Sequence, residues 1–339
     1  MYTLTVMNMS AAEVVGWTHY FQIALIVEFI LLIINFLQTL FMWYLVHFTN
    51  QYHRNLALLV EQICNQYFVS VLSRMFIIYM QITELRMDIL LQNEYFLFAI
   101  WLRNSLLFVA FYCAPFLVFE RVFATYYMAD YENNQRRWIA YILIFLLYTI
   151  SFTSAQLFIF VPSTDAFHTI LISCTNLFAF ALTILTDRYN RLQYRALRRS
   201  LTCCYSLSSR VQLAENIKSS RPFKVLCLLI AVFAFISSSM LHVDRYTNNE
   251  TIRNVVYLVF NYSCWSYGTF VPIFMLFYNK KWQEEVIRLK RIVVFRNHHQ
   301  IPLQRISKNE VKDSFGRNCL VDGKQQTDVY FSQLKFDWK

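Results

Sequence analysis

Two adjacent residues of opposite charge, Glu120 and Arg121, stand directly after the apolar run FLFAIWLRNSLLFVAFYCAPFLVF, residues 96–119. An unpaired charge at the end of a buried helix is costly, so each side chain is expected to be paired or to reach water. In one interpretation, Arg121 extends to the lipid headgroups and Glu120 offsets its charge. In the other, the ion pair is a switch that holds a helical bundle closed, and its release presents a cationic side chain to a partner protein.

Three further ionisable residues, Glu28, Arg74 and Arg103, lie inside long apolar runs. Each is about seven or eight residues from one end of its run, which places all three roughly 10–12 Å deep at the rise of an α-helix. Ionisable groups buried in a helical bundle are functional candidates. One interpretation is a structural bridge from Glu28 to either arginine. In the other, the spare arginine receives an anionic or strongly polar group of a small ligand, surrounded by the aromatic side chains Tyr79, Trp101, Tyr257 and Trp265.

The composition indicates which elements position these charges. Of the 339 residues, 57% are hydrophobic and 15% are charged, whereas a soluble chain carries about 25% charged residues. The polar residues separate apolar blocks that are long enough for a helix to cross about 30 Å of hydrocarbon, and only 4 Gly and 5 Pro interrupt them. The sequence therefore predicts an all-α, polytopic membrane protein, a bundle of seven transmembrane helices at about 20–46, 56–82, 96–124, 138–160, 166–186, 223–243 and 252–277.

The distribution of Lys and Arg predicts the orientation, because cytoplasmic loops are enriched in both residues. The segment before the first span has neither, and the loops 83–95 and 244–251 have one each, Arg86 and Arg245. By contrast, eight lie in 187–222 and thirteen follow residue 277. The N-terminus is therefore expected outside, which excludes the inverted topology of insect odorant receptor channels. The net charge of +10 then reflects membrane topology, and no nucleic-acid partner is expected.

The predicted spans divide the chain into four regions. Residues 1–19 form an extracellular N-terminus and 20–277 the seven-helix membrane domain. In 278–295, apolar residues recur at helical spacing among basic ones, at Trp282, Val286, Leu289 and Val293. This amphipathic helix is expected to lie along the inner leaflet or, alternatively, to pack on the cytoplasmic loops. Residues 296–339 are polar and aperiodic, so a disordered cytoplasmic tail is expected.

Sequons and cysteines are consistent with this topology. N-glycosylation is expected at Asn8 and Asn249, which fall on the predicted outer side, whereas the sequon at Asn261 lies inside the last span and should be inert. No cysteine falls in a predicted outer loop, so no extracellular disulfide is expected. Cys203 and Cys204 lie in a basic inner loop, where free thiols are favoured and palmitoylation stays open.

Three stretches resemble a known family. ERVFATYYMADYE (120–132) and YSLSSRVQLAENI (205–217) resemble, in order and position, two motifs of the class epsilon (Sre) family of nematode serpentine chemoreceptors, and PIFMLFYNKKW (272–282) is similar more weakly. The resemblance covers about residues 20–295. It implies a G-protein-coupled receptor in the plasma membrane of chemosensory neurons, in their cilia, which binds a small external chemical and activates a heterotrimeric G protein.

The resemblance also implies roles for single residues. Glu120 and Arg121 would form the lock that closes the third helix, and Glu215 is the expected second partner of Arg121. Positions assigned to G-protein coupling or its lock are Glu120, Arg121, Asp130, Glu132, Arg210 and Glu215. The chain departs from rhodopsin-like receptors, because it lacks a Cys near the outer end of the third span and an N-P-x-x-Y motif in the last. No Lys in that last span is available for a retinal Schiff base.

Other classes of membrane protein fit less well. His168 and His242 stand alone, without the spacing that a metal-dependent hydrolase needs, so neither an enzyme nor a cofactor or metal is expected. A transporter would favour internal repeats or helices broken at matching positions. The alternative to a receptor is a ligand-gated ion channel or a transporter of the plasma membrane, because pore linings can lack any distinctive pattern.

Overall fold

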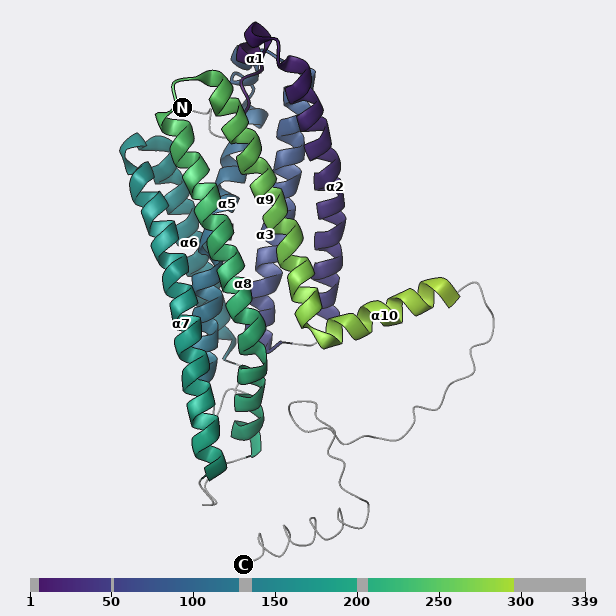
Figure 1. Cartoon of the computed structure of the whole chain (residues 1–339), viewed down its shortest axis with the longest axis vertical. Coiled ribbons are helices and arrows are strands. Elements are labelled where there is room, and N and C mark those ends of the chain that lie inside the picture. Colours follow the sequence, from purple (N-terminus) through teal and green to yellow (C-terminus); the bar gives the residue numbers. More distant parts are fainter. Residues whose placement is uncertain (1–5, 50–51, 128–135, 200–206, 296–339) are drawn as a thin grey trace, which may run out of the picture.

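The computed structural model describes residues 6–49, 52–127, 136–199 and 207–295, and the regular elements among them are all helical. Long helices run side by side, and the last helix leaves the base of the bundle at a steep angle (Figure 1). In chain order the elements are α1 (Met9–Val15), α2 (Thr18–Phe48), α3 (Arg54–Thr83), α4 (Met87–Leu90), α5 (Glu94–Tyr126), α6 (Arg137–Phe160), the 3-10 turn η2 (Pro162–Thr164), α7 (Asp165–Arg199), α8 (Leu207–Tyr246), α9 (Glu250–Tyr278) and α10 (Lys280–Phe295).

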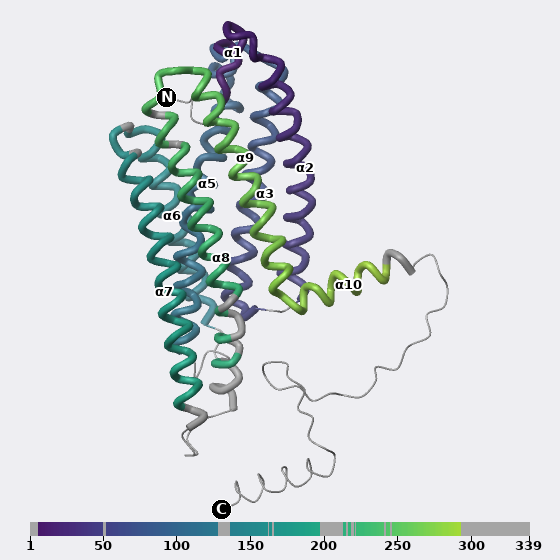
Figure 2. The backbone as a smooth tube through the Cα atoms, viewed as in Figure 1, coloured from purple at the N-terminus to yellow at the C-terminus, as the bar shows by residue number. Residues whose placement is uncertain are grey.

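Six of the described helices are long and apolar enough to cross a membrane: α2, α3, α5, α6 and the stretches Ala166–Ala196 of α7 and Pro222–Asp244 of α8. The seventh, α9, has 29 residues, which suffices for about 30 Å of hydrocarbon. It is not among the six apolar spans, and it carries polar residues that it buries against its neighbours, among them Asn254 and Asn261. Because α9 packs between α8 and α2 (Figure 2), it completes the predicted seven-helix bundle, and the predicted fold class is confirmed.

The predicted and observed spans differ by a few residues, except at one end of the bundle. There α7 continues to Arg199 and α8 begins at Leu207, whereas the hydropathy pattern placed the span boundaries at 186 and 223. Hydropathy detects the apolar part of a helix only, and both helices continue into polar sequence. Figure 1 shows them reaching farther than α2, α3 and α9 at the end where α10 departs.

Local signals explain where several helices begin and end. The Oδ1 atom of Asn93 accepts hydrogen bonds from the backbone N–H groups of the first turn of α5, and Asn249 caps α9 in the same way. The helix α1 ends at Gly16, whose φ of 76° is the left-handed conformation that favours glycine. Pro115 and Pro272 lie inside α5 and α9. The Phe111 carbonyl, which loses its helical donor at Pro115, accepts a hydrogen bond from Asn176 Nδ2 of α7 at 2.9 Å instead.

The central helix of the bundle is α5. Of its most apolar 18-residue stretch 72% is buried, against 22–39% for the other five apolar spans, because it packs against α3, α6, α7 and α8. The other helices turn one apolar face outward, as α2 does with Ile23, Ile30 and Leu37. Exposed aliphatic faces of this kind suit a helix that contacts lipid on one side.

The helices α1 and α10 pack against opposite ends of the bundle. At one end, α1 packs on α2 and α9, and Met7 and Met9 are buried among α2, α3 and α9. At the other end, Trp282 of α10 is fully buried and donates its indole N–H to Thr49 Oγ1 at 2.9 Å. The loop residues Asp130 and Glu132, the pair Cys203 and Cys204 and the tail 296–339 lie outside the described residues.

Candidate functional site

A buried ion pair joins α2 to α3 in the half of the bundle covered by α1. Arg74 donates to Glu28 through Nε at 2.6 Å and through Nη2 at 2.5 Å, and both side chains are 1% exposed. The two parallel hydrogen bonds give a planar, bidentate contact. Of the two bridges that the sequence left open, the structure therefore contains the one between Glu28 and Arg74.

This ion pair continues into a wider polar network. Arg74 Nη1 donates to the Tyr257 hydroxyl of α9, and the guanidinium lies 4.9 Å from the centre of that ring. Tyr257 in turn donates to Gln81 Oε1 at 3.2 Å, and Gln81 Nε2 donates to the Met7 carbonyl at 3.1 Å. The network thus fixes α2, α3 and α9 to the N-terminal segment that covers this end.

Arg103 of α5 differs from Arg74 in its partners. Its Nη2 atom donates to Asn261 Oδ1 of α9 at 2.5 Å, and the amide of Asn261 donates in turn to the Tyr257 carbonyl at 2.8 Å. The Nε and Nη1 atoms of Arg103 have no hydrogen-bond partner within the part of the chain that the structure describes, although the side chain is 3% exposed. Of the two arginines, Arg103 is therefore the one without a carboxylate partner among the described residues.

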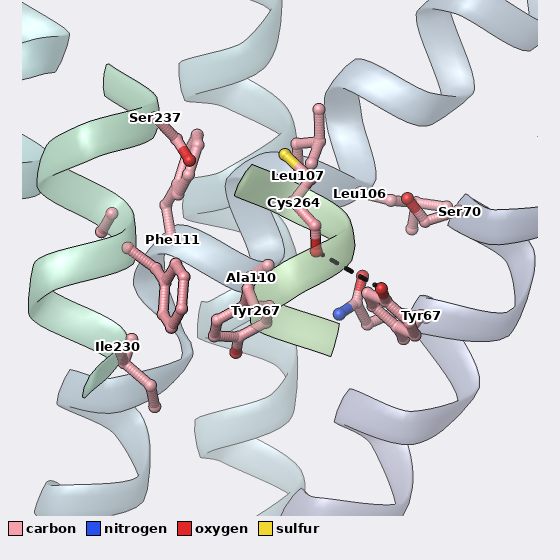
Figure 3. A pocket seen from close by; sticks show the side chains of 13 residues that line it. Tyr67, Ser70, Leu106, Leu107, Ala110, Phe111, Ile230, Ser237, Cys264 and Tyr267 are labelled. Atoms are coloured by element: carbon pink, nitrogen blue, oxygen red, sulfur yellow. Dashed lines mark hydrogen bonds between the residues drawn. The ribbon is translucent and has the colours of Figure 1, made fainter. Parts of the chain in front are cut away.

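A cavity lies one helical turn deeper than Arg103, between α3, α5, α8 and α9. It encloses about 30 Å³ and is lined mainly by apolar side chains. Figure 3 shows side chains from all four helices around it, among them Tyr67, Phe111, Ile230 and Tyr267. Gln66 also lines it, 3% exposed, and neither its Nε2 nor its Oε1 has a partner among the described residues.

One wall of the cavity depends on a glycine. The Tyr67 hydroxyl accepts from Asn35 Nδ2 at 3.0 Å and donates to the Cys264 carbonyl at 3.5 Å, the contact drawn in Figure 3. A Cβ atom at Gly268 would lie 1.7 Å from that hydroxyl. Glycine is therefore required at this position for Tyr67 to pack against α9.

At the opposite end of the bundle, Glu120 and Arg121 form the predicted ion pair. Arg121 donates to Glu120 through Nε at 2.6 Å and through Nη2 at 2.8 Å. The Glu120 side chain is fully buried, and that of Arg121 is 15% exposed. Because both residues belong to α5, their bond fixes the position of the guanidinium but does not itself join two helices.

A second cavity, also about 30 Å³, opens beside Arg121 between α5, α7 and α8, and its lining includes Asp187, Asn190 and Asn216. Here an interhelical ion pair does occur. Asp187 of α7 accepts from Lys224 Nζ and from Ser220 Oγ of α8, and from Arg191 Nε of its own helix at 3.0 Å. The carboxylate of Asp187 therefore connects α7 to α8 next to the Glu120–Arg121 pair.

The segment between α2 and α3 connects this region to α10. Asn279, at the start of α10, donates to the Tyr52 hydroxyl at 3.4 Å, and the ring of Tyr52 packs edge-on against Trp282. Burial raises the pKa of Tyr52, although the Asn279 hydrogen bond and the nearby charge of Arg121 both lower it. Tyr52 is therefore a neutral hydrogen-bonding group at physiological pH.

The remaining predicted positions lie as follows. Arg210 and Glu215 are on α8, but their side chains lie outside the described set, so the expected contact of Glu215 with Arg121 stays a prediction. Asn8 caps α1 and its amide donates to Glu250 at 3.2 Å, whereas Asn249 is an exposed cap of α9. Within the described residues, no group of three or more His, Cys, Asp or Glu could hold a metal ion.

Sequence reasoning missed the roles of Gln66, Asn261 and Asp187. Asn261 had been considered only as part of an inert sequon, and Asp187 was placed just beyond a predicted span. A signal for Asp187 existed in its spacing of four residues from Arg191, which is the distance of an ion pair along a helix. The burial of Gln66 and the partners of Asn261 depend on how helices rotate against each other, and a single sequence does not show this rotation.

Comparisons with known proteins agree with this architecture. Serpentine receptor class epsilon-8 of Caenorhabditis elegans is 28% identical over 98% of this chain and 95% of its own length. Serpentine receptor class epsilon-13 of the same nematode is 32% identical over 73% of this chain and 71% of its own length. The profile of the Sre G protein-coupled chemoreceptor family matches residues 3–339. The chain therefore belongs to the Sre family of G protein-coupled chemoreceptors, which are multi-pass membrane proteins.

Proposed function

We propose that this chain binds a small external chemical within the helical bundle and, in response, activates a heterotrimeric G protein at the end where Arg121 lies. Membership of a G protein-coupled chemoreceptor family supports the receptor class. The observation that carries the coupling role is the position of Arg121, held by a buried carboxylate and lining a cavity between three helices. A cationic side chain placed there is suited to contact a partner protein once the cavity widens.

The proposed mechanism needs two events at this end of the bundle. Contacts between Asp187 of α7 and both Lys224 and Ser220 of α8 resist separation of these helices. If ligand binding favours an arrangement in which α8 moves away from α7, these contacts break and the cavity beside Arg121 opens. Arg121 can then leave Glu120 and contact the G protein. The ligand supplies the driving force through its higher affinity for the open arrangement.

The proposal includes an orientation. With the N-terminus outside, as the Lys and Arg distribution predicts, the α1 end faces the exterior and the Arg121 end faces the cytoplasm. The receptor would then act in the plasma membrane, and the family resemblance suggests the cilia of sensory neurons. The basic helix α10 would lie along the inner leaflet, because its Lys and Arg side chains are exposed while Trp282 is buried in the bundle.

The test is second-messenger output from cells that express the full chain, screened against soluble and volatile small molecules. Arg121→Ala is expected to keep normal surface expression and to abolish the ligand response. Arg86→Ala, at an exposed arginine of the opposite end, is the matched control and should respond normally.

Two outcomes would contradict the proposal. A wild-type response of Arg121→Ala would exclude the role of this side chain in coupling. A ligand-evoked current that survives both Arg121→Ala and removal of G proteins would assign the chain to the channel alternative.

A further inference from the structure

We propose that Arg103 is the anion-binding residue of the receptor's ligand site, and that the ligand is a small organic monocarboxylate whose apolar body extends toward the cavity beside Gln66, which widens to receive it. This inference rests on the proposed function and specifies its ligand. It assigns different roles to two arginines that the sequence could not distinguish.

Charge balance is the first argument. The buried network contains Glu28, Arg74 and Arg103, hence one negative and two positive charges. Glu28 is fully engaged by the bidentate contact with Arg74, and the structure has no ion pair to Arg103 among the described residues. A buried charge without a counter-ion is strongly unfavourable in a membrane. One monoanion would neutralise the network, whereas a neutral or cationic ligand would not.

The geometry of Arg103 is the second argument. Asn261 holds one terminal nitrogen and thereby orients the guanidinium, while Nε and Nη1 remain without partners among the described residues. These two atoms lie on different edges of the guanidinium, because Nε shares an edge with Nη2, as in the contact of Arg74 with Glu28. Each of the two atoms can therefore donate a single charge-assisted hydrogen bond to an anionic group.

The cavity is the third argument. Arg103 precedes Leu106 and Leu107, which line the cavity, by three and four residues of α5, or about 5–6 Å along the helix. On the α9 side, Asn261 precedes the lining residue Cys264 by one turn. The walls below the arginine are therefore apolar. Arg103 itself does not line the cavity, whose volume of about 30 Å³ is close to that of one water molecule, so the apolar body of a ligand enters only when the helices around the cavity move apart.

Gln66 indicates a further feature of the ligand. Its amide is buried and both polar atoms lack a partner among the described residues, which costs free energy in the empty site. Because an amide both donates and accepts, it can pair with a hydroxyl or carbonyl group at the far end of the ligand. Carboxylic acids that carry such a group should bind more tightly than their unsubstituted counterparts.

Direct binding to the purified, full-length receptor tests this inference without any G protein. The probes are butanoate, hexanoate and 6-hydroxyhexanoate, with hexan-1-ol and hexylamine as neutral and cationic counterparts, and the readout is the shift of the unfolding temperature in detergent. We expect the carboxylates to stabilise the wild type and the alcohol and amine not to do so at equal concentration. Of the two six-carbon acids, the hydroxylated one should act at lower concentration.

Variants assign the effect to residues. Arg103→Met removes the cation at similar volume and should raise the carboxylate concentration for half-maximal stabilisation at least about tenfold, the lower range for a hydrogen bond to a charged group. Arg288→Met, at an exposed arginine of α10, is the control and should match the wild type. Gln66→Leu should abolish the preference for the hydroxylated acid, whereas Asn65→Leu, on the exposed face of α3, should preserve it.

The outcomes separate this inference from the proposed function. Equal stabilisation by alcohol and carboxylate, or an unchanged carboxylate response in Arg103→Met, would overturn the ligand assignment. If Arg103→Met does not fold, the comparison of carboxylate, alcohol and amine on the wild type decides alone. If carboxylates bind but evoke no second-messenger output, the ligand site at Arg103 is retained and the proposed coupling is contradicted. If a ligand evokes signalling in both the wild type and Arg103→Met, the proposed coupling is retained, but Arg103 is not the residue that binds the ligand.

Discussion

Arg74 and Arg103 are the same residue type at similar depth, yet their energetic roles differ because of a single carboxylate. Glu28 and Arg74 are a closed structural pair, since each satisfies the other within hydrogen-bonding distance and both are buried. Arg103 has an amide as its described partner and keeps donors for another molecule. Substitutions at these positions should therefore affect stability and ligand binding separately.

Glu28→Gln is expected to destabilise the receptor by about 3–5 kcal/mol, because it leaves the buried charge of Arg74 without a counter-ion. The double variant Glu28→Leu with Arg74→Met removes both charges and should recover most of the loss. Denaturant unfolding of the purified receptor in detergent measures both effects. Glu84→Gln, in an exposed pair with Arg86, should leave the midpoint unchanged. A Glu28→Gln variant as stable as the double variant would show that the pair is not structural.

Gly268→Ala should destabilise the receptor by about 1–3 kcal/mol, the range for overpacking a core. The added methyl group overlaps the hydroxyl and ring of Tyr67, whose position is fixed by Asn35. Adding Tyr67→Leu removes the overlapping atoms and should restore part of the stability. If Gly268→Ala is as stable as the wild type in detergent unfolding, α3 and α9 do not pack this closely.

At the scale of elements, the contact between α7 and α8 is the one most relevant to the proposed coupling. The bond between Glu120 and Arg121 lies within one helix, whereas Asp187 bonds to Lys224 and Ser220 across the helix interface. Asp187 thus adds an interhelical contact at a position that neither motif includes. Opening of the cavity beside Arg121 should depend on this contact.

Asp187→Asn is therefore expected to raise ligand-independent signalling several-fold while surface expression stays normal. The amide loses the ionic contact with Lys224, and a hydrogen bond to a charged group contributes about 1.5–3 kcal/mol, so the open arrangement becomes more populated. Basal second-messenger output at matched expression is the measurement. Asp244→Asn, which weakens a contact of α8 with Arg253 of α9 at the opposite end, is the control. Basal output equal in both variants would contradict the role of Asp187.

For the whole molecule, the sequence alone predicted the helical bundle and most helix boundaries, because hydropathy depends on composition along each helix. It also predicted that Glu28, Arg74 and Arg103 share a depth, since depth follows from residue spacing. The sequence could not predict which arginine pairs with Glu28, because the pairing depends on how the helices are rotated. It also depends on Tyr257 and Asn261, which bond to Arg74 and Arg103 from α9, a helix far away in the sequence. The hydropathy pattern did not predict the polar end of α7 or the polar beginning of α8, because a helix can continue beyond its apolar span.

The orientation of the whole molecule can be tested by glycosylation in a eukaryotic cell. Thr251→Val removes the sequon at Asn249 but keeps the asparagine, whose Oδ1 caps α9, so the fold is preserved. We expect this variant to lose a glycan, seen as faster migration that matches the enzymatically deglycosylated protein. Asn249 is exposed and the cap uses only its oxygen, so its amide nitrogen is available for the glycan.

The other two sequons give the comparison. Ser10→Ala should change migration less than Thr251→Val, because the Asn8 amide already donates to Glu250 and the residue is half-buried. Ser263→Ala should change nothing, since Asn261 is buried beside Arg103. A receptor that expresses at the surface without a glycan at Asn249 or Asn8 would place the α1 end inside the cell. The ligand site at Arg103 would then face the cytoplasm, and neither an external ligand nor coupling through Arg121 could be upheld.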